Sequence, residues 1–201
     1  NDFITSPEIS QMFGEIIGVF LINFWEKNIQ SEFNLIELGP GTGTLIEDII
    51  RSAKVNKKFL NSTNLFLIEK NEALIKKQKE RLSNINVKNL KWCKKFDINN
   101  DKPSIVYSNE FFDCFPVRQF FKKINWYEKF IKYNNSQKNF YFKSEEIRNN
   151  KLLQSLEKFD HSEIAEISNS RKNYYDIICK FIRKNKGIFL TIDYGYKALP
   201  K

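Results

Sequence analysis

Three glycines, Gly39, Gly41 and Gly43, fall within five residues, although the whole chain contains only seven glycines. They follow a short apolar run at residues 35–38 and precede a segment whose apolar residues recur at helical spacing. A turn between such a strand and helix lies at the carboxyl end of the strand, where open α/β sheets bind their ligands. Glycine lets the backbone approach a ligand closely because it has no Cβ atom. We therefore interpret the turn as a ligand-binding loop rather than as a plain tight turn.

Two carboxylates accompany this loop and indicate the kind of ligand. Glu37 lies two residues before Gly39, and Glu69 ends the next apolar run, at residues 65–68. The loop departs from the dinucleotide fingerprint, because Thr44 occupies its third Gly/Ala position, and no Walker A lysine follows. A carboxylate repels a pyrophosphate but attracts a sulfonium or ammonium group, and Glu69 is placed to accept hydrogen bonds from ribose hydroxyls. These features favour S-adenosylmethionine over NAD.

A third position follows the next expected strand. Asp97 is placed to accept a hydrogen bond from an adenine amine while Ile98 packs on the ring, although an ordinary surface-loop aspartate explains Asp97 equally well. The candidate cofactor-binding residues are therefore Glu37, Gly39, Pro40, Gly41, Gly43, Glu69, Asp97 and Ile98.

The elements that must position these residues alternate between strands and helices. Strands are expected at residues 35–38, 65–68, 87–96, 104–109 and 188–192, and helices at residues 7–27, 44–53 and 72–82 and before Gly187. At the start of the first helix, Ser6 is expected to be the N-cap and Pro7 the first helical residue. Alternation with apolar strands predicts an α/β fold, with a mostly parallel sheet covered by helices on both faces.

Residues 117–143 interrupt this alternation with an aromatic-rich segment that predicts an inserted antiparallel meander, followed by a helical segment at residues 144–158. We expect an N-terminal helix at residues 1–30 to pack on the sheet, and a cofactor-binding core at residues 31–116 and 160–201. The insertion at residues 117–159 is then the substrate or partner region. Its own core is expected to consist of Phe120, Phe121, Trp126, Tyr127, Phe130 and Tyr133.

Composition excludes several classes of protein. The single histidine, His161, has no identifiable partner, and the three cysteines are far apart, so neither a histidine triad nor a metal site is expected. No apolar run reaches the roughly 18 residues of a membrane span. The net charge of +9 comes mostly from lysine, whereas base readout relies on arginine. Nucleic acid is therefore an unlikely partner, although the charge keeps RNA methylation open as an alternative.

Four blocks of the sequence resemble the MidA-like methyltransferases, bacterial and mitochondrial relatives of the complex I assembly factor that methylates arginine. They are DFITSPEISQMFGE at residues 2–15, ELGPGTGTL at 37–45, NEFFD with FPV and QF at 109–120, and IDYG at 192–195. Thr42 stands where many relatives carry arginine, and Cys114 where alanine is usual. The resemblance implies a class I methyltransferase fold, S-adenosylmethionine as cofactor, protein arginine as substrate and a respiratory complex I subunit as target.

The resemblance also directs attention to two further groups of residues. Asn109, Glu110 and Asp113 are the catalytic candidates, because two carboxylates can hold a guanidinium by charge-assisted hydrogen bonds; helix capping is the alternative. Thr5, Ser6 and Glu8 are the substrate-binding candidates, although plain capping explains Ser6 and Glu8 nearly as well. A catalytically inactive assembly chaperone that keeps the fold is the alternative function.

The last expected strand, at residues 188–192, lies close to the end of the sequence. A class I methyltransferase sheet normally adds two further strands, and without them this apolar strand is an unpaired edge. We therefore expect the sequence to be part of a longer chain, cut at both ends. The expected location is the cytoplasm for a bacterial protein and the mitochondrial matrix for a eukaryotic one.

Overall fold

The computed structural model describes residues 4–159 and 164–195. His161, together with Asp2 and Phe3 of the first resembling block, lies outside the described residues. The chain divides into two compact units, with the division falling after Cys114 and again after Tyr174. We describe each unit by itself.

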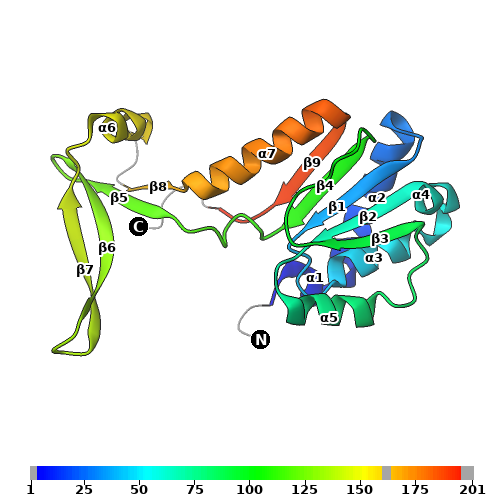
Figure 1. Ribbon diagram of the computed structural model, residues 1–201, viewed down its shortest axis with the longest axis horizontal. Helices are drawn as coiled ribbons and strands as arrows, with labels where there is room; N and C mark the ends of the chain where they lie inside the picture. Colours follow the sequence, from blue (N-terminus) through cyan, green and yellow to red (C-terminus); the bar gives the residue numbers. More distant parts are fainter. Residues whose placement is uncertain (1–3, 160–163, 196–201) are drawn as a thin grey trace. The chain divides into compact units, whose positions relative to one another are not determined.

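Unit 1 is built on a five-stranded parallel sheet (Figure 1). Its strand order is β3-β2-β1-β4-β9, and the strands are β1 (Phe33–Leu38), β2 (Thr63–Ile68), β3 (Asn89–Cys93), β4 (Ser104–Asn109) and β9 (Gly187–Ile192). All six residues of β1 are buried. A strand that is apolar on both sides, at the centre of a parallel sheet, needs helices on both faces.

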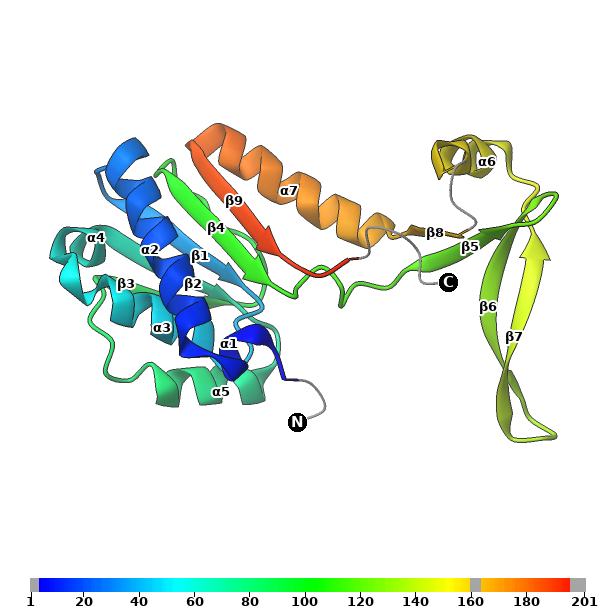
Figure 2. The ribbon, with the colours of Figure 1, turned by 180° about the vertical axis from the view of Figure 1, so that it is seen from behind.

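Helices cover the two faces of this sheet. Figure 2 shows α2 (Gln11–Asn28) and α3 (Thr44–Ser52) on one face, and Figure 1 shows α7 (Asn169–Asn185) on the other. The glycines of α2 make its contact with α3 close, since a Cβ atom on Gly18 would lie 2.1 Å from the Ser52 hydroxyl. Shorter helices complete the unit: α1 (Ser6–Ile9), α4 (Lys57–Ser62), α5 (Glu72–Arg81) and the 3-10 turn η1 (Ala53–Val55). The predicted α/β fold, with a parallel sheet covered by helices on both faces, is thereby confirmed.

The N-terminal helix is where the prediction for unit 1 was wrong. A single helix was expected over residues 7–27, but Ser10 adopts an extended conformation and separates α1 from α2. Thr5 rather than Ser6 is the N-cap of α1, and Ser6 is already helical. In the sequence, the helical spacing of apolar residues continues from Ile9 to Met12 across Ser10, so the pattern carries no sign of the break. In the structure both side chains are exposed.

Unit 2 contains a four-stranded antiparallel sheet in the order β7-β6-β5-β8. Its elements are β5 (Arg118–Lys122), β6 (Trp126–Asn134), β7 (Asn139–Glu146), α6 (Asn150–Leu156), the 3-10 turn η2 (Glu157–Phe159) and β8 (Ile164–Ile167). Phe120 and Trp126 form its small core together with Leu156 and Ala165. The predicted meander is present, but only these two of its aromatic residues are fully buried there, and Tyr133 is half exposed.

Two boundaries of the insertion differ from the prediction. Strand β8 pairs with β5, so residues 164–167 belong to unit 2 rather than to the cofactor-binding core. Strand β7 continues to Glu146, where a helical segment was expected from residue 144. The polar ending of β7, Lys143 to Glu146, carries no apolar alternation because every residue of the strand is exposed.

Candidate functional site

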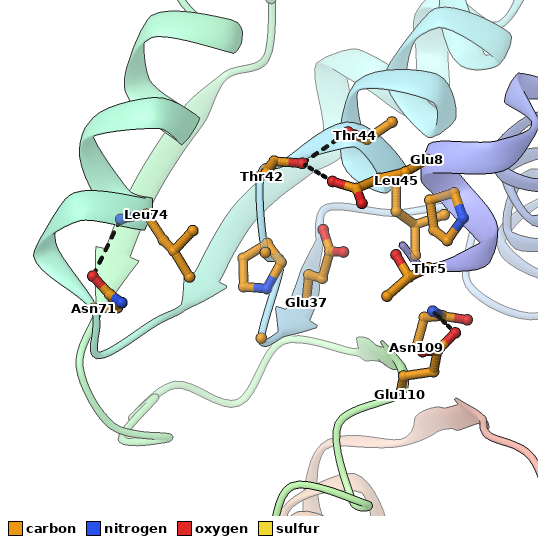
Figure 3. Close-up of a pocket in the computed structure, with 14 residues that line it drawn as sticks. Thr5, Glu8, Glu37, Thr42, Thr44, Leu45, Asn71, Leu74, Asn109 and Glu110 are labelled. Carbon is orange, nitrogen blue, oxygen red and sulfur yellow. Dashed lines mark hydrogen bonds between the residues drawn. The ribbon is translucent and has the colours of Figure 1, made fainter. Parts of the chain in front are cut away.

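A cavity of about 630 Å³ opens beside the carboxyl ends of β1 and β4 in unit 1 (Figure 3). This volume lies within the range of small-molecule and cofactor sites. Eight predicted site residues line the cavity, namely Thr5, Glu8, Glu37, Gly39, Pro40, Gly41, Asn109 and Glu110. The structure therefore gathers residues from the glycine turn, from α1 and from the end of β4 around one space.

The glycine turn connects β1 to α3, and its three glycines all have positive φ angles, of +61° for Gly39, +56° for Gly41 and +84° for Gly43. The amide of Gly43 donates to the carbonyl oxygen of Pro40 at 2.8 Å, which closes the turn. A Cβ atom added to Gly41 would meet no protein atom within 4 Å, so the backbone at Gly41 borders open space. The turn thus has room for a ligand to lie against its backbone, although Gly43 itself does not line the cavity.

Glu37 is the most deeply buried ionisable group at the cavity, with 2% of its surface exposed. The hydroxyl of Tyr107 on β4 donates to its Oε2 atom at 3.0 Å. Burial raises the pKa of the Glu37 carboxyl from 4.5 to about 8, and the Tyr107 hydroxyl opposes this only in part. Parallel pairing of β1 with β4 sets Glu37 opposite Tyr107 and so brings the two side chains together.

Helix α1 borders the same cavity. Thr5, Pro7 and Glu8 line it, and the Thr42 hydroxyl donates to Glu8 Oε1 at 3.0 Å (Figure 3). This bond links α1 to the glycine turn. Ser6, the remaining substrate-binding candidate, does not line the cavity.

The catalytic candidates follow β4 and differ in their placement. Glu110 lines the cavity in a left-handed conformation with φ of +49°, and its amide donates to the carbonyl oxygen of Ile192 on β9. Its carboxylate accepts hydrogen bonds from the Asn109 amide at 3.2 Å and from the Tyr194 hydroxyl at 3.1 Å. Asp113 does not line the cavity. Burial, followed by the charges of Asp193 and Glu110, raises the pKa of Asp113.

The remaining cofactor-binding candidates lie outside the cavity lining. The carboxylate of Glu69 accepts hydrogen bonds from the backbone amides of Lys70 at 2.8 Å and Asn71 at 2.9 Å. Both hydrogen bonds use Oε1, and Oε2 has no protein partner among the described residues. Asp97 is exposed and Ile98 is half-buried. Contact between these three side chains and a bound cofactor stays a prediction.

Sequence reasoning missed several residues that shape the site, and three of them make hydrogen bonds to predicted site residues. Tyr107 contacts Glu37, Tyr194 contacts Glu110, and Gln78 on α5 donates to the carbonyl oxygen of Gly41 at 2.8 Å. Gln78 is fully buried and in turn accepts a hydrogen bond from the Trp92 indole. Each contact joins segments far apart in the sequence. The one sequence signal is Gln78 itself, an uncharged polar residue within an otherwise charged, lysine-rich helix.

In charge and shape the cavity suits a cationic ligand of nucleoside size. Its ionisable lining residues are Glu8, Glu37 and Glu110, and no lysine or arginine of the described residues lines it. The buried carboxyl of Glu37 has no cationic partner among the described residues, so a cationic ligand could pair with it. The open space beside Gly41 provides room for that ligand.

Comparisons with a family model and with known proteins point to the same family. A family model described as "Putative S-adenosyl-L-methionine-dependent methyltransferase" matches residues 16–200. The chain is 30% identical over 97% of its length to the mitochondrial protein arginine methyltransferase NDUFAF7 homolog of Caenorhabditis elegans. It is 34% identical over 65% of its length to mitochondrial protein arginine methyltransferase NDUFAF7 of Mus musculus. The match covers 50% of the first relative and 35% of the second, so the chain spans half or less of their lengths.

The fold also matches a solved structure. A COG1565 superfamily protein from Burkholderia thailandensis, described as a methyl transferase candidate and bound to S-adenosyl-homocysteine, superposes with a TM-score of 0.77 at 20% identity. The superposition covers 98% of this chain and 50% of that protein. At this level of identity the likeness concerns the fold. None of the helices in the described part of the chain has the length and apolar character that a membrane crossing requires.

Proposed function

Because the chain belongs to the MidA-like family of S-adenosyl-L-methionine-dependent methyltransferases, we propose that the cavity binds S-adenosylmethionine and that the protein methylates arginine in a protein substrate. One observation carries the proposal: the backbone of Gly41 borders open space inside a cavity whose ionisable lining residues are all acidic. Such a cavity attracts the sulfonium and ammonium charges of this cofactor. The names of the two relatives support arginine as the substrate.

The cofactor, when bound, supplies a methyl group on a positively charged sulfur. Around it, the glycine turn offers backbone without Cβ atoms, and Glu37 offers a negative charge at the end of β1. Glu110 and Asn109 lie on the same cavity and would orient the guanidinium through charge-assisted hydrogen bonds. Because a guanidinium is too basic to be deprotonated readily, these groups act by orienting it and by localising its charge.

Two glycine variants test the cofactor site. Gly41 and Gly43 both have positive φ angles, so an alanine at either position carries similar backbone strain, on the order of 1 kcal/mol. Only Gly41 lines the cavity. We expect Gly41→Ala to abolish binding of S-adenosylmethionine in isothermal titration calorimetry, and Gly43→Ala to bind close to wild type. Equal affinities in both variants would contradict the site.

The target protein is a separate part of the proposal. The resemblance implies a subunit of respiratory complex I, and the relatives are mitochondrial proteins by name, so the matrix is the proposed location for a eukaryotic source. Mass spectrometry of the complex I subunits from a deletion strain tests this. We expect a methylarginine present in the parent strain to be lost and to return with the wild-type gene but not with Glu110→Gln.

A second candidate function, a chaperone that binds a subunit without methylating it, is favoured by the exposed apolar residues of unit 2. The β6–β7 hairpin exposes Ile131, Phe140 and Phe142. If the protein acts as a chaperone, we expect the Glu110→Gln variant to support complex assembly and the Phe142→Ser variant to fail. If the protein acts as an enzyme, we expect the Glu110→Gln variant to fail to support complex assembly.

A further inference from the structure

In the part of the chain that the structure describes, the buried carboxyl group of Glu37 has a hydroxyl partner but no cationic partner. Among the described residues, the Tyr107 hydroxyl is its one side-chain hydrogen-bond partner, at 3.0 Å. Tyr107 is itself buried, with 1% of its surface exposed, so water does not compete freely for this bond. Yet Glu37 lines the cavity, and Figure 3 shows its carboxylate between the glycine turn and Thr5.

The charged groups around Glu37 provide no cation either. The ionisable side chains on the surrounding elements are Glu8 on α1, Glu15, Glu26 and Lys27 on α2, Glu47, Asp48 and Arg51 on α3, Glu69 and Lys70 after β2, Glu72, Lys76, Lys77, Lys79, Glu80 and Arg81 on α5, and Glu110 and Asp113 after β4. None of the lysines and arginines in this set lines the cavity. Arg51 is engaged elsewhere, since it hydrogen-bonds Asp48 and lies 3.5 Å from Glu15. Two of the carboxylates, Glu8 and Glu110, share the cavity with Glu37. A further negative charge in this group is unfavourable until a cation enters.

Burial therefore favours the neutral form of Glu37 while the cavity holds no cation. It raises the pKa of this carboxyl to about 8, so at neutral pH the proton is retained. A positive charge within a few ångströms favours the ionised form and lowers the pKa again. Entry of a cation must then expel the proton.

We propose that binding of the cationic part of S-adenosylmethionine is coupled to the release of one proton from Glu37, with Tyr107 as the positioning residue that favours the ionised carboxylate. The O–H bond of the Glu37 carboxyl breaks, the proton passes to the solvent, and the carboxylate keeps its hydrogen bond from Tyr107 while it faces the ligand's positive charge. This inference rests on the proposed cofactor site.

The coupling fixes the direction of the pH dependence. Because binding releases a proton, affinity rises with pH by about tenfold per pH unit between the Glu37 pKa of the ligand-bound protein and that of the ligand-free protein, and it levels off above the latter. The ligand has titrating groups of its own, so a variant that lacks the Glu37 proton must serve as the reference. Glu37→Gln is that variant, because the amide has nearly the same shape and does not titrate in this range.

Calorimetry on the full-length protein measures the released protons directly. Titrations of S-adenosylmethionine at about pH 7, in two buffers with different heats of ionisation, give the number of protons exchanged per ligand bound. We expect wild type to release close to one proton more than Glu37→Gln, and the affinity of Glu37→Gln to lose the steep rise with pH. Equal proton counts in the two proteins would overturn the coupling.

Tyr107→Phe tests the positioning role with the loss of a single hydroxyl. Without this donor the carboxyl ionises less readily, so affinity at about pH 7 should fall roughly tenfold and its rise should continue to higher pH. A purely structural role would lower thermal stability without moving the pH profile. If Tyr107→Phe does not fold, the proton count of Glu37→Gln still decides the coupling.

The outcomes separate this inference from the proposed function. Failure of wild type to bind S-adenosylmethionine at any pH would overturn the cofactor site and this inference with it. Binding with no proton release would overturn the coupling alone. S-adenosylhomocysteine lacks the sulfonium charge but keeps the ammonium group, so proton release with both ligands supports coupling to the ammonium, and release with S-adenosylmethionine alone supports coupling to the sulfonium.

Discussion

Each unit of the molecule buries one glutamate in its sheet, and the two glutamates have different partners. In unit 2, Glu128 on β6 is 7% exposed and accepts two hydrogen bonds from the Arg118 guanidinium, at 2.6 and 2.7 Å. In unit 1, Glu37 on β1 is 2% exposed and accepts one hydrogen bond from a tyrosine hydroxyl. The charge of Glu128 is therefore compensated by an arginine of its own chain, whereas the described residues offer Glu37 no cation.

The difference distinguishes a structural carboxylate from one that is reserved for a ligand. A buried charge is tolerated when it is paired and hydrogen-bonded, and the fork of Arg118 provides this pairing for Glu128. Glu37 lies beside a cavity and has no cation among the described residues. Burial without a ligand therefore favours its neutral form, and we expect the ligand to bring the compensating charge.

The largest expected effect concerns the stability of unit 1 in the absence of ligand. Burial raises the pKa of Glu37 from 4.5 to about 8, so between these pH values the folded state holds a proton that the unfolded state lacks. The free energy of unfolding should then fall as pH rises through this window, by about 1.4 kcal/mol per pH unit, and level off above it. Glu37→Gln removes this contribution and should be the more stable protein by several kcal/mol at about pH 8.

Urea unfolding of wild type and Glu37→Gln over a pH series measures this difference. Only the difference between the two curves matters, because other groups titrate in both proteins. Curves that stay parallel from about pH 5 to 8 would show that Glu37 is ionised in the folded protein, and the contrast with Glu128 would then fail.

The same substitution in unit 2 should have the opposite sign. Glu128→Gln removes the charge that the Arg118 fork binds and should destabilise the β5–β6 pair by about 1–2 kcal/mol. The side chain of Arg118 is about half exposed, so water limits the loss. Hydrogen exchange of the β5 and β6 amides measures it. The control is Glu157→Gln: this exposed glutamate lies in η2, outside the β5–β6 pair, and its substitution should leave exchange unchanged.

The sequence predicted the parts of the fold that depend on short segments. The strand, glycine turn and helix from Phe33 to Ser52 formed as expected, because burial on both faces of β1 makes most of its residues apolar, with Asn34 and Glu37 as the exceptions. The partner of β5 could not be predicted in the same way. Strand β8 has only four residues and is separated from β5 by more than forty positions, so its pairing depends on the tertiary fold.

The site was predictable to a similar extent. Residue type and spacing drew attention to Glu37, the family resemblance drew attention to Glu110, and both residues line the cavity. Tyr107 could not be recognised as the partner of Glu37, because their contact requires β4 to lie beside β1 in this register. Glu69 was expected to face a ribose, and the hydrogen bonds to its carboxylate from the following two amides depend on a local turn that sequence spacing does not reveal.

The smallest expected effect on stability is at the β6–β7 hairpin of unit 2, whose apolar side chains are exposed, whereas those in the sheet of unit 1 are buried. Phe142 is 67% exposed and lies opposite Ile131 on β6, with the Lys129 ammonium 4.2 Å from the centre of its ring. Phe142→Ser should change the free energy of unfolding by less than about 0.5 kcal/mol, since little surface is buried there. Phe120→Ser in the same sheet removes a fully buried ring and should cost roughly 3–5 kcal/mol.

This pair of phenylalanine variants separates a role in folding from a role in binding. Urea unfolding of both proteins gives the stability difference, and assembly of the target complex in cells gives the functional one. If the exposed hairpin contacts the protein substrate, Phe142→Ser should lose function while it keeps the stability of wild type. A loss of stability as large as that of Phe120→Ser would mean that the Phe142 ring is packed in the folded protein. The hairpin would then belong with Glu128, among the groups whose partners the chain itself provides.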